Sequence, residues 1–296
     1  MNLDSYLKDR LDLVDRGLDT FLPDADRLPG ALHKAMRYSV FAGGKRIRPI
    51  LMCAACEAVG GMAEMALPAA CAIEMLHTYS LIHDDLPAMD DDDFRRGRPT
   101  NHKVFGEATA ILAGDALLTE AFLLLSAPEV LPAVTAEVRR DLIHILAHAA
   151  GSLGMVGGQV VDMESEGKTI NLPTLEYIHT HKTGALILAA VQMGALIGGA
   201  DATTMTALTR FGEAAGLAFQ IADDILDIIG EQDVVGKDIG SDQARGKATY
   251  PALLGLEEAK RRACELRDLG ITALSELGTA AEPLRQIVHY IVDRSS

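Results

Sequence analysis

Hydrophobic and polar positions follow a helical period along nearly the whole chain. Segments rich in Ala, Leu, Met and Glu alternate with Gly and Pro punctuation, for example at Gly60-Gly61 and between Pro128 and Pro132. The alternating Val, Ile and Thr runs that indicate strands are lacking, as is any low-complexity linker or internal repeat. The pattern therefore predicts one all-α domain over residues 1–296, with about ten or more helices.

Two of the predicted helices carry polar residues on an otherwise apolar surface. The first lies between Leu67 and Asp85, and the second between Phe211 and Asp227. Their polar positions recur at steps of three and four, as on one helix face: Glu74, His77, Thr78, Asp84 and Asp85 in the first, and Glu213, Gln220, Asp223, Asp224 and Asp227 in the second. A helix that is apolar nearly all round is buried. We therefore expect both polar stripes to face an internal cavity.

Each of these helices ends in an acidic cluster, Asp84-Asp85-Leu86-Pro87-Ala88-Met89-Asp90 and Asp223-Asp224-Ile225-Leu226-Asp227. Two unit charges about 4 Å apart repel by about 4 kcal/mol at an effective dielectric of about 20. A hard divalent cation removes this repulsion, because Mg²⁺ takes oxygen ligands and bridges carboxylates to substrate phosphates. Pro87 should end the first helix and let the chain return towards Asp84. The clusters predict one metal site built from two helices.

Composition narrows the class of protein. The chain has 49% hydrophobic residues, a net charge of −15 and a pI near 5.0, which argue against nucleic acid or an anionic membrane as a partner. Four cysteines are few for a disulfide framework, so we expect a reducing, cytoplasmic location. The N-terminus does not resemble a signal peptide. The apolar stretch from Gly184 to Ala200 is interrupted by Gln192 and predicts a core helix. Cys53 and Cys56 are interpreted as buried hydrophobes.

The two acidic clusters resemble the aspartate-rich motifs of the trans-isoprenyl diphosphate synthases. Further motifs follow in the order of that family: Gly43-Gly44-Lys45-Arg46-Ile47-Arg48-Pro49, Arg95-Arg96-Gly97-Arg98-Pro99, Gly158-Gln159-x-x-Asp162, His181-Lys182-Thr183-Gly184, Phe219-Gln220 and Gly236-Lys237-Asp238. The chain is most similar to the bacterial short-chain type, the farnesyl diphosphate synthases. The resemblance implies the all-α isoprenoid synthase fold, with helices around a central catalytic cavity.

The resemblance also implies a Mg²⁺-dependent prenyl transfer. Isopentenyl diphosphate would be condensed with dimethylallyl or geranyl diphosphate to give (2E,6E)-farnesyl diphosphate, in a homodimer. The implied metal ligands for three Mg²⁺ are Asp84, Asp90 and Asp223, with Asp85, Asp224 and Asp227 acting partly through water. The implied isopentenyl diphosphate ligands are Lys45, Arg48, His77 and Arg96. The implied allylic diphosphate ligands are Arg95, Lys182, Thr183, Gln220 and Lys237, with Lys247 a weaker candidate.

Product length is implied by Tyr79, the fifth residue before the first aspartate motif. In the family this position commonly sets the floor of the tunnel that holds the growing chain. Ideal helix geometry places Tyr79 about 140° around from Asp84, so this role comes from the resemblance alone. Pro87 and Ala88 match an insertion found in the short-chain bacterial type. Together they imply a product of fifteen carbons.

Several alternatives remain open from the sequence. Lys45, Arg46 and Arg48 could form a solvated basic turn, and His77 could be a core histidine. A geranylgeranyl diphosphate synthase would use the same motifs. A class I terpene cyclase would also ionise a diphosphate, and Asp223, Asp227 and Glu231 match the spacing of its second motif, but it needs no second diphosphate site. A regulatory subunit without catalysis should carry a broken aspartate motif, and both motifs are complete here.

Overall fold

The structure of the protein is a computed structural model, which describes residues 1–229 and 247–293. Its helices are α1 (Leu3–Phe21), α2 (Gly30–Val40), α3 (Ile47–Ala58), α4 (Ala63–Asp84), α5 (Asn101–Phe105), α6 (Glu107–Ser126), α7 (Ala136–Ala150), α8 (Met155–Ser165), α9 (Leu172–Ile178), the π-helix η1 (His179–Gly184), α10 (Ala185–Ile197), α11 (Ala202–Ile229), α14 (Tyr250–Leu254), α15 (Leu256–Ala273), the 3₁₀-helix η2 (Ser275–Ala281) and α16 (Glu282–Asp293). The antiparallel pair β1 (Phe94–Arg95) and β2 (Arg98–Pro99) forms a two-stranded sheet. The all-α prediction is confirmed.

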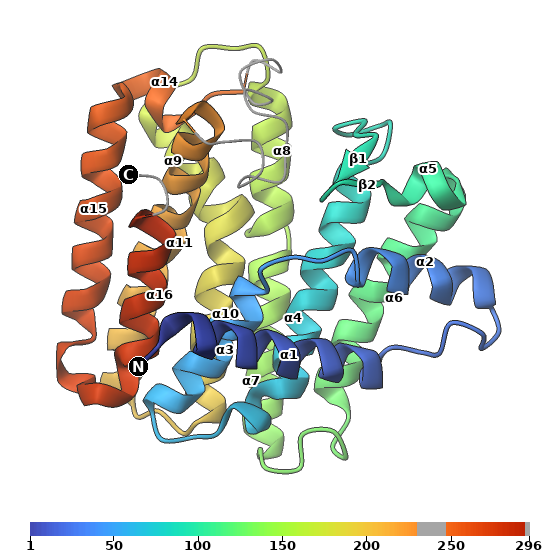
Figure 1. Cartoon of the computed structure of the whole chain (residues 1–296), viewed down its shortest axis with the longest axis horizontal. Coiled ribbons are helices and arrows are strands. Elements are labelled where there is room, and N and C mark those ends of the chain that lie inside the picture. The colour runs from blue at the N-terminus through green and yellow to red at the C-terminus, as the bar shows by residue number, and fades with distance from the viewer. Residues whose placement is uncertain (230–246, 294–296) are drawn as a thin grey trace.

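Long helices that run side by side build the body of the molecule, with α3, α4, α10 and α11 at its centre (Figure 1). Helices α1 and α2 run across the others, and α15 and α16 cover one side. The C-terminal ends of α4 and α11 point to the top of the view in Figure 1, where β1 and β2 also lie. The two acidic clusters are therefore carried to the same end of the molecule.

The core helix predicted between Gly184 and Ala200 is present as α10. It packs directly on the backbone of α3 because Gly194 has no side chain. A Cβ at Gly194 would lie 2.1 Å from the carbonyl oxygen of Met52, far inside van der Waals contact. Cys53 and Cys56, on the same face of the core, are both buried and free, which confirms their interpretation as small hydrophobes.

Two helices, α4 and α6, are long and apolar enough to cross a membrane by length and composition alone. Core helices pass the same test, and 72% of the most apolar stretch of α4 is buried in the fold. Helix α6 differs, because only 39% of its apolar stretch is buried. Its outer face exposes Ile111, Leu112 and Leu123. This apolar face of α6 needs a separate explanation.

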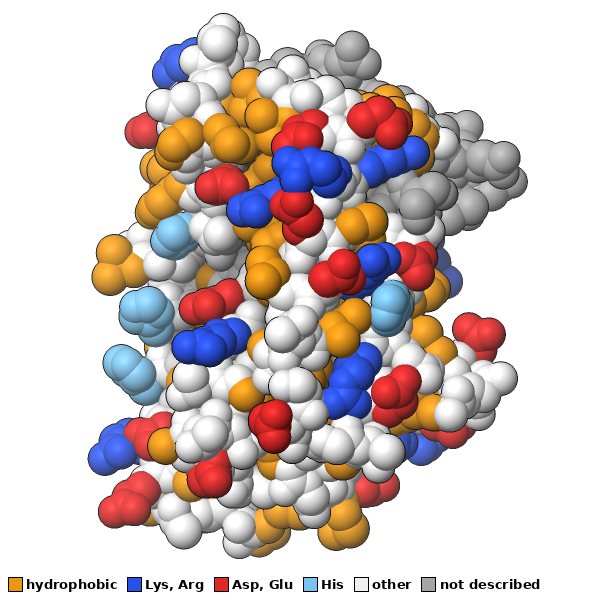
Figure 2. All heavy atoms as spheres, turned by 90° about the vertical axis from the view of Figure 1, so that its left-hand side faces the viewer, with side chains coloured by type: hydrophobic (Ala, Val, Ile, Leu, Met, Phe, Trp, Pro, Cys, Tyr) orange, Lys and Arg blue, Asp and Glu red, His pale blue; other side chains and the backbone are white. Residues whose placement is uncertain are grey.

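Helix α15 presents a different kind of surface. Figure 2 shows the side of the molecule on which α15 lies, with acidic and basic side chains interspersed over it. Arg261 is paired there with Glu258 and Glu265, one turn away in each direction. Such i,i+3 and i,i+4 pairs are typical of a helix face exposed to solvent.

Candidate active site

The first acidic cluster folds back on itself, as the position of Pro87 predicts. Helix α4 ends at Asp84, and the backbone N–H of Asp90 donates a hydrogen bond of 2.8 Å to the carbonyl oxygen of Asp84. The return of the chain brings the two aspartates together. Burial raises the pKa of Asp84, and the nearby carboxylate of Asp90 raises it further. The site therefore disfavours the charged form of Asp84.

The second aspartate of this cluster has a different partner. Asp85 is buried, and its Oδ1 accepts hydrogen bonds from Arg95 Nε at 2.7 Å and Nη2 at 2.6 Å. Asp92 lies 3.6 Å from the same guanidinium group. Asp85 thus fastens the hairpin that carries Arg95 to the end of α4. Arg95, an expected allylic diphosphate ligand, lies beside the aspartates.

Two lysines lie next to the first cluster. Lys182 Nζ donates to Asp162 Oδ2 of α8 at 2.6 Å, and Lys247 Nζ lies 3.5 Å from Asp90 Oδ1. Although burial disfavours the charge of Lys182, the carboxylates of Asp162 and Asp84 raise its pKa. Lys182 is therefore a cation beside the acidic site. Lys237 lies outside the described residues.

A glycine on α8 makes the position of Lys182 possible. A Cβ at Gly158 would lie 2.3 Å from the backbone nitrogen of Lys182, so only glycine lets α8 approach η1 this closely. On its other side, η1 lies against α11, where Thr183 Oγ1 donates to Gln220 Oε1 at 2.8 Å. The structure thus pairs Thr183 with Gln220 on the α11 side of η1 and directs Lys182 to α8 on the other side.

The prediction that all polar residues of α11 face one cavity is wrong in two places. Glu213 is exposed on the outside of the helix. Asp224 is buried and turned towards η1, where its carboxylate accepts hydrogen bonds from His179, Gln220 and the backbone of Tyr250. Successive helical residues point about 100° apart, so Asp223, which is only partly buried, faces a different side from Asp224. Asp227 is buried as well.

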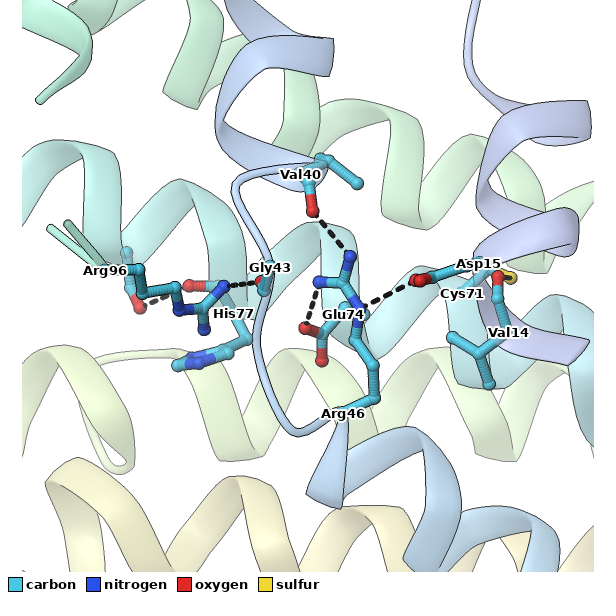
Figure 3. Close-up of polar contacts among 10 residues, drawn as sticks. Val14, Asp15, Val40, Gly43, Arg46, Cys71, Glu74, His77 and Arg96 are labelled. Atoms are coloured by element: carbon cyan, nitrogen blue, oxygen red, sulfur yellow. Dashed lines mark hydrogen bonds and ion pairs between the residues drawn. The ribbon is translucent and has the colours of Figure 1, made fainter. Parts of the chain in front are cut away.

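The basic segment beginning at Gly43 is shaped by positive-φ residues. Gly44 has a φ of +127°, and a Cβ there would lie 2.5 Å from Arg96 Nη1. Because Gly44 has no side chain, Arg96 crosses the loop and donates a hydrogen bond to the carbonyl oxygen of Gly43 (Figure 3). Lys45 is exposed at the tip of the same loop. Lys45 and Arg96, both expected to hold isopentenyl diphosphate, are thus on one surface.

Arg46 contradicts the alternative of a solvated basic turn. Its side chain is 1% exposed and donates to Asp15 at 2.9 Å, Glu74 at 2.8 Å and the carbonyl oxygen of Val40 at 2.6 Å (Figure 3). It adopts a φ of +51° at the start of α3. Arg46 therefore ties three segments of the fold together. Glu74, which belongs to the polar stripe of α4, therefore forms a buried ion pair with Arg46.

Arg48 and His77 complete the basic surface. The Nε of Arg48 is buried and has no hydrogen-bond partner among the described residues. Burial lowers the pKa of Arg48, but an arginine guanidinium is not deprotonated in proteins, so the side chain keeps its positive charge at neutral pH. Burial, together with Arg48 and Arg96, lowers the pKa of His77 well below its usual value, so His77 is neutral at pH 7. An unpaired buried guanidinium nitrogen beside further cations fits an anionic ligand.

The acidic residues fit Mg²⁺ shared with a substrate, but not a cage made by protein alone. Within residues 1–229 and 247–293, no three His, Cys, Asp or Glu side chains converge closely enough to enclose a metal ion. Mg²⁺ is commonly held by one or two carboxylates together with waters and substrate phosphates. Asp84, Asp90 and Asp223 offer only oxygen ligands, and a divalent cation would offset the raised pKa of Asp84. The donor set suits Mg²⁺ on these grounds.

Tyr79 lies in the seam between α4 and α6. Its buried ring packs edge-on against His83, with ring centroids 5.6 Å apart. His83 in turn hydrogen-bonds to the carbonyl oxygen of Ile111 at 3.0 Å and fits over Gly114, where a Cβ would lie 2.2 Å from His83 Nε2. Burial raises the pKa of Tyr79 to about 12. The side chain is thus buried and packed on His83 in the turn of α4 that precedes the first aspartate cluster.

Two residues at the site were not anticipated from the sequence. His179 and Tyr250 both contact Asp224, although they lie far from it along the chain. His179 stands two residues before the His181-Lys182-Thr183-Gly184 motif, and because Thr180 and His181 beside it are polar as well, no signal in the sequence singled it out. For Tyr250 the contact is made by the backbone, which no side-chain pattern could indicate.

Known proteins share this arrangement. The polyprenyl synthetase family model matches residues 29–277. The chain is 54% identical over 262 residues to the farnesyl diphosphate synthase of Geobacillus stearothermophilus, covering 88% of each protein. It is 48% identical over 300 residues to the geranylgeranyl diphosphate synthase of Cyanophora paradoxa, covering 100% of this chain and 97% of that protein.

Solved structures agree over the whole fold. An FPP/GFPP synthase from Zymomonas mobilis has a TM-score of 0.87 at 41% identity, covering 98% of this chain and 99% of that one. The geranylgeranyl pyrophosphate synthetase of Pyrococcus horikoshii has a TM-score of 0.89 at 31% identity, covering 99% and 98%. With both acidic clusters at one end of the molecule, its basic loop and these matches, the chain belongs to the polyprenyl synthetase family.

Proposed function

We propose that this protein condenses isopentenyl diphosphate with dimethylallyl and then geranyl diphosphate, and ends at (2E,6E)-farnesyl diphosphate. The names of the relatives from Geobacillus stearothermophilus and Bacillus subtilis, at 54% and 50% identity, support this product. The observation that carries the reaction is the presence of two surfaces of opposite charge, each of which we propose to hold one diphosphate. One is formed by aspartates with two lysines, and the other by arginines with a neutral histidine.

The acidic surface is proposed to take the allylic diphosphate. Bound Mg²⁺ would supply electrostatic stabilisation of the diphosphate as its bond to carbon breaks. Lys182, whose pKa is raised by the carboxylates of Asp162, Asp84 and Asp90, would neutralise the same developing charge from the protein side. Thr183 and Gln220 would fix the place of the diphosphate next to Lys182, with Arg95, Lys247 and Lys237 around it.

The basic surface is proposed to take isopentenyl diphosphate without a metal. Arg48 would satisfy its unpaired Nε on a phosphate oxygen, and Arg96 and Lys45 would add charge. Neutral His77 would donate one hydrogen bond without adding to the repulsion among the arginines. The double bond held there would supply the electron pair for the new carbon–carbon bond, after which a proton is lost.

The proposed product length rests on Tyr79. The growing chain must extend away from the diphosphate, and the buried Tyr79 ring, packed on His83 of α4, would stop it at fifteen carbons. Geranylgeranyl diphosphate is the second candidate product, because relatives with that name match at 48% and 46% identity. A terpene cyclase is disfavoured, because it would have no use for the surface around Arg48.

We further propose a homodimer in which the apolar face of α6 is covered by the second copy. Leu112 and Leu123 are 58% and 59% exposed, and burial of such side chains drives most association. We expect the protein to act in the cytoplasm as one domain, with prenyl diphosphates as partners and no nucleic acid.

The deciding experiment is product analysis by chain length with purified protein, isopentenyl diphosphate, each allylic starter and Mg²⁺. We expect fifteen-carbon diphosphate from either starter and no turnover in excess chelator. Mainly twenty-carbon product would replace the length assignment, whereas diphosphate release without isopentenyl diphosphate would indicate a cyclase. Full activity in chelator would contradict the metal assignment.

A further inference from the structure

The second aspartate of the α11 cluster is already fully engaged by protein groups. Asp224 Oδ2 lies 2.8 Å from His179 Nε2 and accepts the backbone N–H of Tyr250 at 2.9 Å, while Oδ1 accepts Gln220 Nε2 at 3.0 Å. The residue is only 2% exposed. A carboxylate with three donors and no contact with solvent is placed to hold structure, because losing it would leave those donors unpaired in the interior.

The contacts of Asp224 belong to a regular seam between α11 and η1. On α11, Gly216, Gln220 and Asp224 are four residues apart and so share one face. A Cβ at Gly216 would lie 3.0 Å from Gly184 Cα, at the far end of η1. Gln220 accepts from Thr183 in the middle of the seam, and Asp224 pairs with His179 at the start of η1. The whole length of the π-helix is thereby fixed against α11.

The π-helix is the element that presents the substrate-facing lysine. π-turns are rare and occur often at functional sites, because the wider turn re-aims side chains. Lys182 leaves η1 on the side away from the seam and reaches Asp162 of α8. A shift of η1 along α11 would therefore move Lys182 relative to Asp84 and Asp90.

We infer that Asp224 and His179 act as a positioning pair, which holds η1 in register against α11 and so sets the place of Lys182 and Thr183 at the allylic diphosphate. Gln220 extends the effect, because its amide donates to Asp224 and accepts from Thr183, so the carboxylate also orients the threonine hydroxyl. The role assigned to Lys182 and Thr183 rests on the proposed function; the pairing of Asp224 with His179 does not.

The test uses three seam variants: His179→Ala, Asp224→Asn and the double variant that carries both changes. Thr180→Ala serves as their control. Thr180 is the neighbour of His179 in η1, but it is exposed, and its hydroxyl hydrogen-bonds within α9 and η1, to the carbonyl oxygens of Glu176 and Tyr177 and to His181 Nδ1. We expect each seam variant to raise the allylic KM about ten-fold or more, as for loss of a hydrogen bond to a charged group. The isopentenyl diphosphate KM and the Mg²⁺ concentration for half-maximal rate should stay unchanged. His179→Gln, whose amide can donate in place of Nε2, should restore much of the allylic KM.

Two outcomes would overturn the inference. If Asp224→Asn raises the Mg²⁺ requirement while His179→Ala does not, Asp224 serves a metal. If His179→Ala affects both substrates equally, the histidine only stabilises the fold.

A readout without turnover separates this inference from the proposed function. In denaturant unfolding, the free energy of unfolding of the double variant should equal that of the less stable single variant, because both changes remove the same contact. Additive losses would contradict the pairing even in an inactive protein. Failure to make any prenyl product would instead contradict the proposed function.

Discussion

The N–H of Asp90 and the carbonyl oxygen of Asp84 are joined by a 2.8 Å hydrogen bond, which closes the chain into a loop at the end of α4. The two carboxylates are thereby held close enough to repel each other. Burial and this repulsion raise the pKa of Asp84, so the folded state takes up a proton more readily than the unfolded state does. The metal-free protein should accordingly lose stability as pH rises above the unfolded pKa of Asp84.

Asp84→Asn tests this conflict between stability and function. In chelator at pH 7, the variant should melt higher than the wild type by about 2–4 °C, and the difference should disappear near pH 4. With Mg²⁺ and substrates, its kcat should fall by orders of magnitude. Asp91→Asn, on an exposed loop residue, serves as the control and should change neither value. A lower melting temperature for Asp84→Asn would refute the argument.

The two diphosphate surfaces should respond separately to mutation. Arg96→Ala or Arg48→Ala should raise the KM for isopentenyl diphosphate about ten- to hundred-fold, because a charged partner of the phosphate is lost. Lys182→Ala should instead impair the allylic substrate and kcat. Steady-state kinetics with each substrate varied in turn will show the split. Arg98→Ala, an exposed arginine on the same hairpin, is the matched control. An unchanged isopentenyl diphosphate KM in Arg96→Ala would show that its assignment is wrong.

Replacement of the Tyr79 ring should lengthen the product. Tyr79→Ala removes the side chain packed on His83 and should shift product from fifteen towards twenty carbons. Because the diphosphate surfaces are untouched, the single-turnover rate with geranyl diphosphate should change little. Product from Tyr79→Phe provides the control, since it keeps the ring and loses only the hydroxyl. If Tyr79→Ala still stops at fifteen carbons, another residue forms the floor.

The apolar face of α6 predicts how the protein assembles. Leu112→Glu together with Leu123→Glu should convert a dimer to monomers in sedimentation velocity, because charges would be buried unpaired in the contact. Leu269→Glu on α15, where the leucine is equally exposed at 59%, should leave the dimer intact. Monomeric wild-type protein at micromolar concentration would contradict the proposed contact.

His77 should make stability depend on pH in the opposite sense to Asp84. Its folded pKa is lowered by burial and by the arginines, so the unfolded state binds the proton more readily. Stability should be fully present above about pH 6.5 and should fall as the pH drops below it. His77→Gln should flatten this fall in denaturant unfolding between pH 7.5 and 5. His148→Gln on the exposed side of α7 controls for loss of a histidine.

Much of this fold was predictable because helical periodicity and apolar composition are local signals. The core helix α10, the return of Asp90 to Asp84 and the placement of α4 and α11 with their acidic ends at the same end of the molecule followed from sequence. The partners of Asp224 did not, because Tyr250 contributes a backbone group and His179 belongs to a π-turn whose extra residue breaks the regular spacing. The burial of Arg46 was equally hidden, since it depends on the positions of Asp15 and Glu74 in other helices.

Arg46 has a consequence for the reading of related genomes. Within the same basic segment, Arg46 is buried in the fold and Arg48 keeps an unpaired nitrogen for an anion. A descendant that abandoned prenyl transfer would still need Arg46 in order to fold, but would be free to lose Arg48. A survey that scores the whole segment as one motif would therefore count proteins that fold but have lost the activity as active enzymes. Scoring Arg46 and Arg48 separately distinguishes a protein that keeps only the fold from one that keeps the activity.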